Sequence, residues 1–280
     1  MAFILPTQFY LDYQEEFFKL RLGRAPYHFG LGTTYSARNN PFDEWMSLYN
    51  QLNLYMEYEF FYIQPGLILN KEGFFAKEDR ILALLQAGLK RPDWSLSALF
   101  QSSFKKDSFV EVFGEYKNSN WDLKASSSYA FKTGTHFSLA LEGAMDLPLP
   151  LATELKIKTG GITGDLVFHP NYDLALLFWN RWMSKENQRE KQYPYQIAEG
   201  QAQNGVYFSP SLLFTIPQMN LQIQPLFLVA GIFEDKKLNY ELDLKARYQW
   251  AKHLFFSLTA GALYTNKLSL AVSAKTAASF

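Results

Sequence analysis

The chain has 280 residues, enough for one large domain or two small ones. Its 27 basic and 27 acidic residues give a formal net charge of zero, which argues against a strongly basic nucleic-acid-binding protein or an acidic tail protein. It contains no cysteine, so disulfides and thiolate metal sites are excluded. Aromatic residues make up 17% of the chain and charged residues only 19%. The mean hydropathy is still slightly negative, because the apolar residues are interspersed with polar ones.

This dispersion excludes a helical membrane protein. A membrane-spanning helix needs about 20 mostly apolar residues in a row. The longest apolar runs here, 174–179 and 226–233, are far too short. No basic segment with an apolar stretch and a cleavage site opens the chain, so no signal peptide is visible. We therefore expect that a leader has been removed or that the chain starts late.

The dominant pattern along the chain has a period of two. From 238 to 250, apolar residues alternate without a break with Asn239, Glu241, Asp243, Lys245, Arg247 and Gln249. Successive side chains of a strand point to opposite faces, so this segment predicts a strand with one apolar and one polar face. A helix would place the charges all round. Similar alternation occurs in 107–118, 120–132, 219–233 and 267–280.

Turn-forming residues separate these segments, for example Asn118-Ser119-Asn120, Thr159-Gly160-Gly161 and Pro217-Gln218. The pattern predicts strands at 2–12, 15–25, 49–58, 61–70, 79–90, 93–105, 107–118, 120–132, 135–146, 151–159, 162–169, 172–182, 203–216, 219–233, 238–250, 253–264 and 267–280. Most exceed the roughly five or six residues usual in soluble sandwiches and match the roughly 9–11 of tilted membrane strands. We predict one domain over residues 1–280, an all-β, antiparallel, up-and-down transmembrane β-barrel.

The predicted strand count is odd, whereas bacterial single-chain barrels have even numbers. We therefore expect 16–18 strands. Either an N-terminal strand is missing from this chain, or one predicted strand does not exist. The weakest segments are 2–12, which contains Pro6, and 162–169. The segment from Gly160 to Trp182 could instead fold inward as a constriction.

The lengths of the connections predict which end of the barrel faces outward. If Phe280 lies on the periplasmic side, the long connections 26–48, 71–78 and 183–202 all fall on the outer side, as is typical of outer-membrane barrels. Aromatic residues gather near strand ends, as in interfacial girdles. A C-terminal aromatic residue that ends an amphipathic strand resembles the assembly signal of Gram-negative outer-membrane proteins. We therefore expect the outer-membrane lipids and the barrel-assembly machinery to be partners of this chain.

Four stretches carry a family resemblance. The chain reads Arg21-Leu22-Gly23-Arg24-Ala25-Pro26-Tyr27-His28-Phe29-Gly30-Leu31-Gly32, then Pro41-Phe42-Asp43-Glu44-Trp45, Phe61-Tyr62-Ile63-Gln64-Pro65 and Phe168-His169-Pro170-Asn171-Tyr172-Asp173. These stretches resemble the alginate-export-like and porin-like outer-membrane barrels of Gram-negative bacteria. The resemblance implies an outer-membrane location and a transport function. It does not specify a substrate.

The polar face of the strands predicts the lining of a pore. The acidic candidates are Glu57, Glu59, Glu111, Glu115, Asp122, Glu142, Glu154, Glu241 and Asp243. The basic candidates are Lys19, Arg21, Lys117, Lys124, Lys156, Lys158, Lys245, Arg247 and Lys275. Because the two signs are balanced, we expect weak charge selectivity, unless acids and bases segregate to opposite walls. The balance also argues against a polyuronate as the cargo, because the alginate exporters have a strongly basic lumen.

Two finer hypotheses concern the first strands. Lys19 and Arg21 could face Glu57 and Glu59 across the pore and create a transverse field, or the charges could simply form cross-strand ion pairs. Arg24, together with Gly23, Gly30 and Gly32, could shape a loop that folds into the pore, or these glycines could only bend the chain.

A search for catalytic residues gives little. His136 and Ser138 lie two apart on one strand face with Glu142 beyond, which resembles the His-x-Ser of outer-membrane phospholipases. However, Leu139 follows the serine where that family has Asn-Gly. The residues also face the predicted lumen, whereas a lipase site faces lipid. We expect no enzyme activity and no cofactor, because no metal constellation, phosphate loop or dinucleotide motif occurs.

We therefore predict a porin-like channel for passive diffusion of small hydrophilic solutes, because 16 to 18 strands enclose an aqueous channel. One alternative is a more selective barrel that exports or imports a saccharide or sugar polymer. Another is a plugged structural or adhesive barrel that acts through its surface loops. A large soluble β-sandwich would instead bury the apolar face, including Leu238, Leu242 and Leu244.

Overall fold

The computed structural model describes residues 9–31, 48–70, 80–103, 108–132, 134–149, 151–163, 204–233, 236–252 and 254–278. These residues form fifteen strands and one short 3₁₀ turn, η2 (Pro217–Met219). The strands are β1 (Phe9–Gln14), β2 (Phe18–Pro26), β3 (Leu48–Tyr58), β4 (Phe61–Asn70), β5 (Arg80–Lys90), β6 (Trp94–Ser103), β7 (Ser108–Lys117), β8 (Trp121–Lys132), β9 (Gly134–Leu147), β10 (Ala152–Thr163), β11 (Gly205–Ile216), β12 (Leu221–Ile232), β13 (Lys237–Ala251), β14 (Leu254–Tyr264) and β15 (Leu268–Ala278). Within these ranges, no helix is long and apolar enough to cross a membrane.

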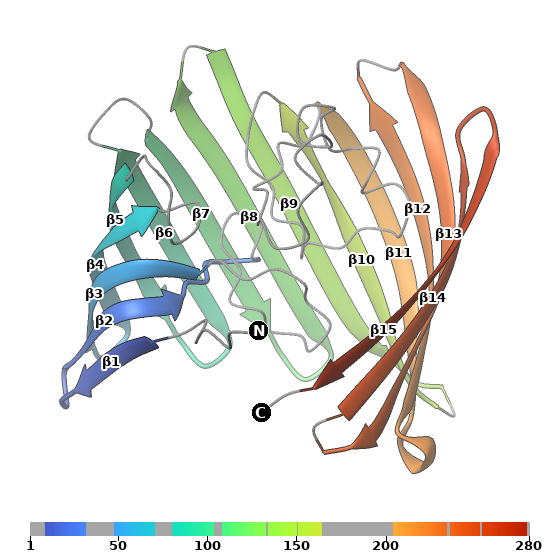
Figure 1. Cartoon of the computed structure of the whole chain (residues 1–280), viewed down its shortest axis with the longest axis horizontal. Helices are drawn as coiled ribbons and strands as arrows, with labels where there is room; N and C mark the ends of the chain where they lie inside the picture. Colours follow the sequence, from blue (N-terminus) through green and yellow to red (C-terminus); the bar gives the residue numbers. More distant parts are fainter. Residues whose placement is uncertain are drawn as a thin grey trace, which may run out of the picture.

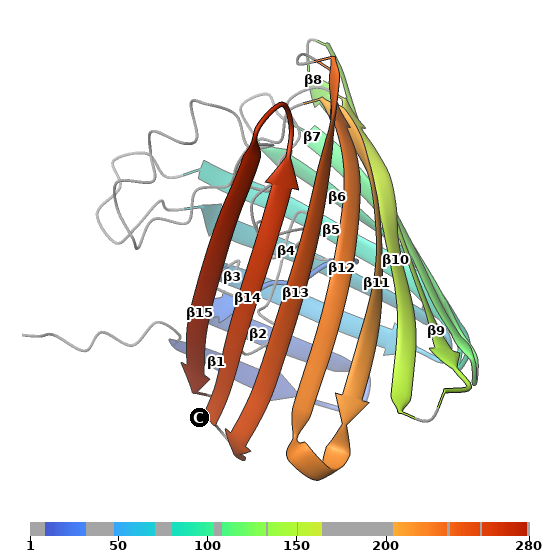
Figure 2. The ribbon, with the colours of Figure 1, turned by 90° about the vertical axis from the view of Figure 1, so that its right-hand side faces the viewer.

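The strands form a single antiparallel sheet in which each strand pairs with its neighbours in the sequence. This is the predicted up-and-down topology. The sheet curls around a central space, with β1 and β15 as its two edges (Figure 1). Seen from the side of β13 to β15, the first strands form the opposite wall (Figure 2). Among the described strands, β1 pairs only with β2 and β15 only with β14, so the wall is curved but open along one line.

Burial shows which face of the sheet lies inside. On β13 the polar residues Asn239, Glu241 and Asp243 are at most 1% exposed. The apolar residues between them are open, with Leu242 59% and Leu244 54% exposed. This distribution is the inverse of a soluble protein, in which large apolar side chains are buried and charges are exposed. It excludes the soluble sandwich and shows the apolar-out, polar-in arrangement of a membrane barrel.

The two ends of the sheet differ in the length of their connections. One end, which we call the short-turn end, carries tight connections such as 91–93, 118–120 and 217–220. The predicted turn at Asn118 is an Asx turn, in which the side-chain oxygen accepts hydrogen bonds from the backbone N–H groups of Asn120 and Trp121, both at 2.8 Å. The opposite, long-loop end carries the long connections 27–47 and 71–79, and it is also where β10 ends and β11 begins. The predicted placement of 26–48 and 71–78 at one end is therefore confirmed, whereas the predicted connection 183–202 lies outside the described residues.

The predicted turn at Thr159-Gly160-Gly161 is wrong. These residues lie inside β10, which runs unbroken through positions assigned to two strands. Gly160 is required because the backbone of the preceding strand, β9, comes close: a Cβ at this position would lie 2.1 Å from the carbonyl oxygen of Leu139. Glycine inside a strand often marks such a close approach of another backbone. The predicted strand 172–182 lies outside the described residues, and β10 pairs directly with β11.

Candidate functional site: the inner face of the barrel

The strand register assigns the predicted pore-lining residues to faces. Those on the inner face are Lys19, Arg21, Glu57, Glu111, Glu115, Lys124, Glu142, Lys156, Glu241, Asp243, Lys245 and Arg247. Two candidates are misplaced. Arg24 pairs with Phe9 and Asn50, so alternation puts it on the face of β2 opposite Arg21. Glu59 lies in the β3–β4 turn with a positive φ of 52° and is exposed at the rim.

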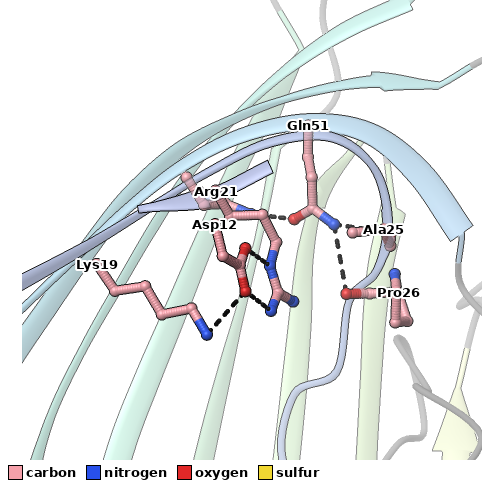
Figure 3. Close-up of polar contacts among 7 residues, drawn as sticks. Asp12, Lys19, Arg21, Ala25, Pro26 and Gln51 are labelled. Carbon is pink, nitrogen blue, oxygen red and sulfur yellow. Dashed lines mark hydrogen bonds and ion pairs between the residues drawn. The ribbon is translucent and has the colours of Figure 1, made fainter. Parts of the chain in front are cut away.

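The first charged group on the inner face is a compact cluster on β1 and β2 (Figure 3). Asp12 accepts two hydrogen bonds from the Arg21 guanidinium, each 2.7 Å long. The Lys19 ammonium lies 2.9 Å from the same carboxylate. Such a two-pronged contact fixes the plane of the guanidinium. The predicted row of Lys19 and Arg21 against Glu57 is therefore replaced by pairing with Asp12, and the cluster keeps one net positive charge.

The second group consists of ion pairs along β7 to β10. Lys124 lies 3.5 Å from Glu115 and 3.1 Å from Asp122, and Lys158 lies 3.4 Å from Glu142. Glu115 and Lys124 are direct partners in the ladder between β7 and β8, and Lys124 and Glu142 in the next. The alternative of cross-strand ion pairs is thus confirmed here. This wall presents many hydrogen-bonding groups but little net charge.

A third feature is a short stretch of chain inside the barrel, residues 27–31, which we call the inward segment. It continues from β2, and Tyr27 and Phe29 are 4% and 2% exposed. The Phe29 ring meets Phe113 of β7 edge-on, with the centroids 6.5 Å apart. Leu31 packs instead against the apolar cluster formed by β9 to β12 and β14. The inward segment therefore connects two walls and narrows the lumen, as the loop hypothesis predicts.

Two features hold the inward segment in its course from β2 into the lumen. Gln51 of β3, only 4% exposed, donates hydrogen bonds to the carbonyl oxygens of Ala25 at 2.7 Å and Pro26 at 3.3 Å, where the chain leaves β2 (Figure 3). Asn53 in turn donates a hydrogen bond to the Gln51 side chain. Gly30 adopts a positive φ of 56°, and a Cβ there would lie 3.2 Å from the Phe113 side chain. Only glycine combines that backbone conformation with that contact at low cost.

Burial changes the ionisation of the inward segment. It lowers the pKa of His28 from the ordinary 6.5, and a hydrogen bond with the Gly30 backbone offsets part of that effect. Burial also raises the pKa of the Tyr27 phenol. Both groups are therefore neutral near pH 7. The segment enters the lumen without a charge of its own.

A cavity of about 670 Å³ lies between the inward segment and the short-turn end. Tyr55, Tyr62 and Gln86 line one side, and Glu115, Lys124 and Glu142 line the other. Alternation places Tyr55 and Tyr62 on the polar face of their strands, but the predicted pore-lining set contains charged residues only. The position of these aromatic residues on a charged face is the sequence signal that would have added both tyrosines to that set.

Three charged residues of β13 are deeply buried. Glu241 and Asp243 are 1% exposed and Lys245 is 6% exposed. They lie in register with Leu228, Leu226 and Gln224 of β12, and the two leucines are also buried. This part of the inner face is therefore packed and does not line open solvent.

The catalytic hypothesis gains nothing from the geometry. Ser138 is 6% exposed and faces inward, in register with Ser128 and Ile162. Among the described residues, no group of three or more His, Asp or Glu side chains is placed to hold a metal ion.

Comparisons with known proteins identify the fold. No family model and no curated protein matches the sequence. Solved structures do match. Acinetobacter baumannii OccAB4 has 11% sequence identity and a TM-score of 0.63, and the match covers 95% of this chain and 74% of that one. Pseudomonas aeruginosa OprD has 12% identity and a TM-score of 0.60, with coverage of 92% and 77%, and P. aeruginosa OccK3 (OpdO) has 8% identity and a TM-score of 0.65, with coverage of 95% and 79%. These are outer-membrane porins of Gram-negative bacteria, not alginate exporters. The chain has the fold of an outer-membrane porin barrel.

Proposed function

We propose that the protein is a porin-like channel of the outer membrane of a Gram-negative bacterium, through which small hydrophilic solutes diffuse passively. The inverted burial on β13 and its neighbours carries this proposal. An apolar outer surface needs lipid around it, and a polar inner face with a cavity of about 670 Å³ offers a path for solutes. The fold shared with the OprD and Occ porins supports it.

We propose weak charge selectivity, since the ion pairs of β7 to β10 cancel within the wall. The test is single-channel conductance of the refolded protein in a planar bilayer under a salt gradient. Stable steps with a reversal potential near zero are expected. A strong reversal potential would contradict weak selectivity. Absence of current from a folded, heat-modifiable barrel would contradict the open channel and favour a plugged or adhesive barrel.

The other assignments are part of the same proposal. Outer-membrane lipids would contact the apolar face, and the barrel-assembly machinery would engage β15 and the C-terminal Phe280 that follows it in the sequence. A closer relation to the alginate-export-like barrels rests on the short sequence stretches alone. We propose no enzyme activity. Ser138→Ala should leave conductance unchanged. If the purified protein hydrolyses lipid and Ser138→Ala abolishes that hydrolysis, the proposal that the protein has no enzyme activity is wrong.

A further inference from the structure

We propose that the cavity below the inward segment is a subsite for a neutral saccharide. This inference rests on the proposed channel function and names the solute class that the channel would hold on its way through. Three observations carry it: a pair of aromatic rings, a fixed set of hydrogen-bonding groups around them, and a facing wall whose charges are paired.

The first observation is the aromatic pair. Tyr55 of β3 and Tyr62 of β4 both line the cavity, and their ring centroids lie 5.6 Å apart with an interplanar angle of 28°. Each side chain is half-buried, so part of each ring is open to the cavity. An aromatic face buries apolar surface while groups at its edge stay hydrated. The C–H face of a sugar ring fits this surface, since its hydroxyl groups project from the rim of the ring.

The second observation is how firmly the rings are held. Gln86 of β5 accepts a hydrogen bond from the Tyr27 hydroxyl at 3.2 Å and donates one to the Tyr62 hydroxyl at 3.0 Å. The Tyr55 hydroxyl donates to Glu57 at 2.6 Å. The tyrosines are therefore oriented before a solute arrives, and such preorganisation reduces the entropic cost of binding.

The third observation is the charge of the facing wall. Glu115 and Lys124 line the cavity and pair with each other, and Glu142 pairs with Lys158. At the short-turn end the cavity is also lined by Lys90, Arg91, Asp93 and Lys117. Its four Lys or Arg and three Asp or Glu lining residues leave the cavity with one net positive charge. Paired carboxylates and ammonium groups still accept and donate hydrogen bonds, but they present little net field to an ion. Hydroxyl groups, which both donate and accept, match such a wall. The cavity volume of about 670 Å³ lies within the range of roughly 300–1,000 Å³ usual for small-molecule sites.

The test uses maltotriose, a neutral glucose oligomer, as the probe. Millimolar maltotriose should interrupt the single-channel current, and titration calorimetry on the detergent-folded protein should detect binding. Tyr55→Ala and Tyr62→Ala should each weaken the apparent affinity about tenfold. Tyr55→Phe should retain most of it, since the ring remains. Tyr129→Ala is the matched control, because Tyr129 lies on the outer face and is 39% exposed.

Each outcome decides one point. If gluconate or lysine blocks the current as strongly as maltotriose does, the saccharide subsite is overturned but the channel is not. The same holds if the Tyr55 and Tyr62 variants fold into heat-modifiable barrels and bind maltotriose with unchanged affinity. Current without any maltotriose block or binding would overturn it too. Calorimetric binding that depends on both tyrosines, in a protein that conducts no current, would support the subsite and overturn the open channel.

Discussion

A single arginine in place of Leu244 tests whether the exposed apolar face lies in lipid. Leu244 is 54% exposed, lies midway along β13 and pairs with Pro225 and Ala260 on the outer face. A cation at the bilayer midplane on a barrel surface costs about 2–4 kcal/mol, and the cost falls to about 0–1 kcal/mol near the interface. Leu244→Arg should therefore lower the folding equilibrium constant into lipid by a factor of about 30 to 1,000.

The matched control is the same substitution at Trp250, near the short-turn end of the same strand. Trp250 is 67% exposed, so more of its side chain is open than that of Leu244. If exposure alone set the cost, Trp250→Arg would be no less harmful than Leu244→Arg. If depth in the bilayer sets it, Trp250→Arg should cost at most about 1 kcal/mol of cation transfer. Urea titration of folding into vesicles, followed by heat-modifiable gel migration, measures both. Equal costs, or a negligible cost at Leu244, would refute the lipid-facing assignment.

Three further predictions concern the lumen. Asp12→Asn leaves the adjacent Arg21 guanidinium and its lysine neighbour without their shared carboxylate, so the reversal potential in a salt gradient should shift toward anion preference; a shift toward cations would contradict the pairing. Gln51→Leu removes the two hydrogen bonds that hold the start of the inward segment and should cost about 1–3 kcal/mol of stability, while conductance rises; unchanged conductance would show that the inward segment does not limit the current. Burial lowers the pKa of His28 below 6.5, so the released segment binds protons more readily than the docked one, and lowering the pH through 6.5 should favour release. Conductance recorded between pH 8 and 5 should then rise, and His28→Gln should abolish that rise.

The faces of the strands could be predicted from local sequence alone. In β13 the alternation assigns the side chains from Leu238 to Trp250 to faces, and burial confirms the assignment from Leu238 to Lys245. The period of a strand is a property of its own backbone, so no information from other strands is needed. The turn prediction failed at Gly160, because the reason for that glycine lies in the neighbouring strand. The placement of Arg24 in the pore came from its motif, whereas counting from Arg21 puts it on the opposite face.

The partners of each charge could not be predicted from alternation. Asp12 and Arg21 meet because the register of β1 and β2 makes them direct partners, and this register follows from the turn between them. The aromatic pair of Tyr55 and Tyr62 depends likewise on the register of β3 and β4. A pattern of faces identifies which residues can meet across a ladder. The turn then decides which of them do.

Departures from alternation carry their own information about the lumen. The longest apolar run in the described residues, 226–233, puts Leu226, Leu228 and Ile232 on the inner face, where each is at most 5% exposed. A strand that faced lipid on one side and water on the other would keep polar residues at those positions. Here the inner side is packed, and Leu31 of the inward segment contributes to that packing. A strand of a membrane barrel that is apolar on both faces therefore marks the filled part of the lumen. The converse does not hold, because β13 alternates strictly and its inner side is nevertheless packed. The open part is identified by the cavity itself, which Glu115, Lys124 and Glu142 line.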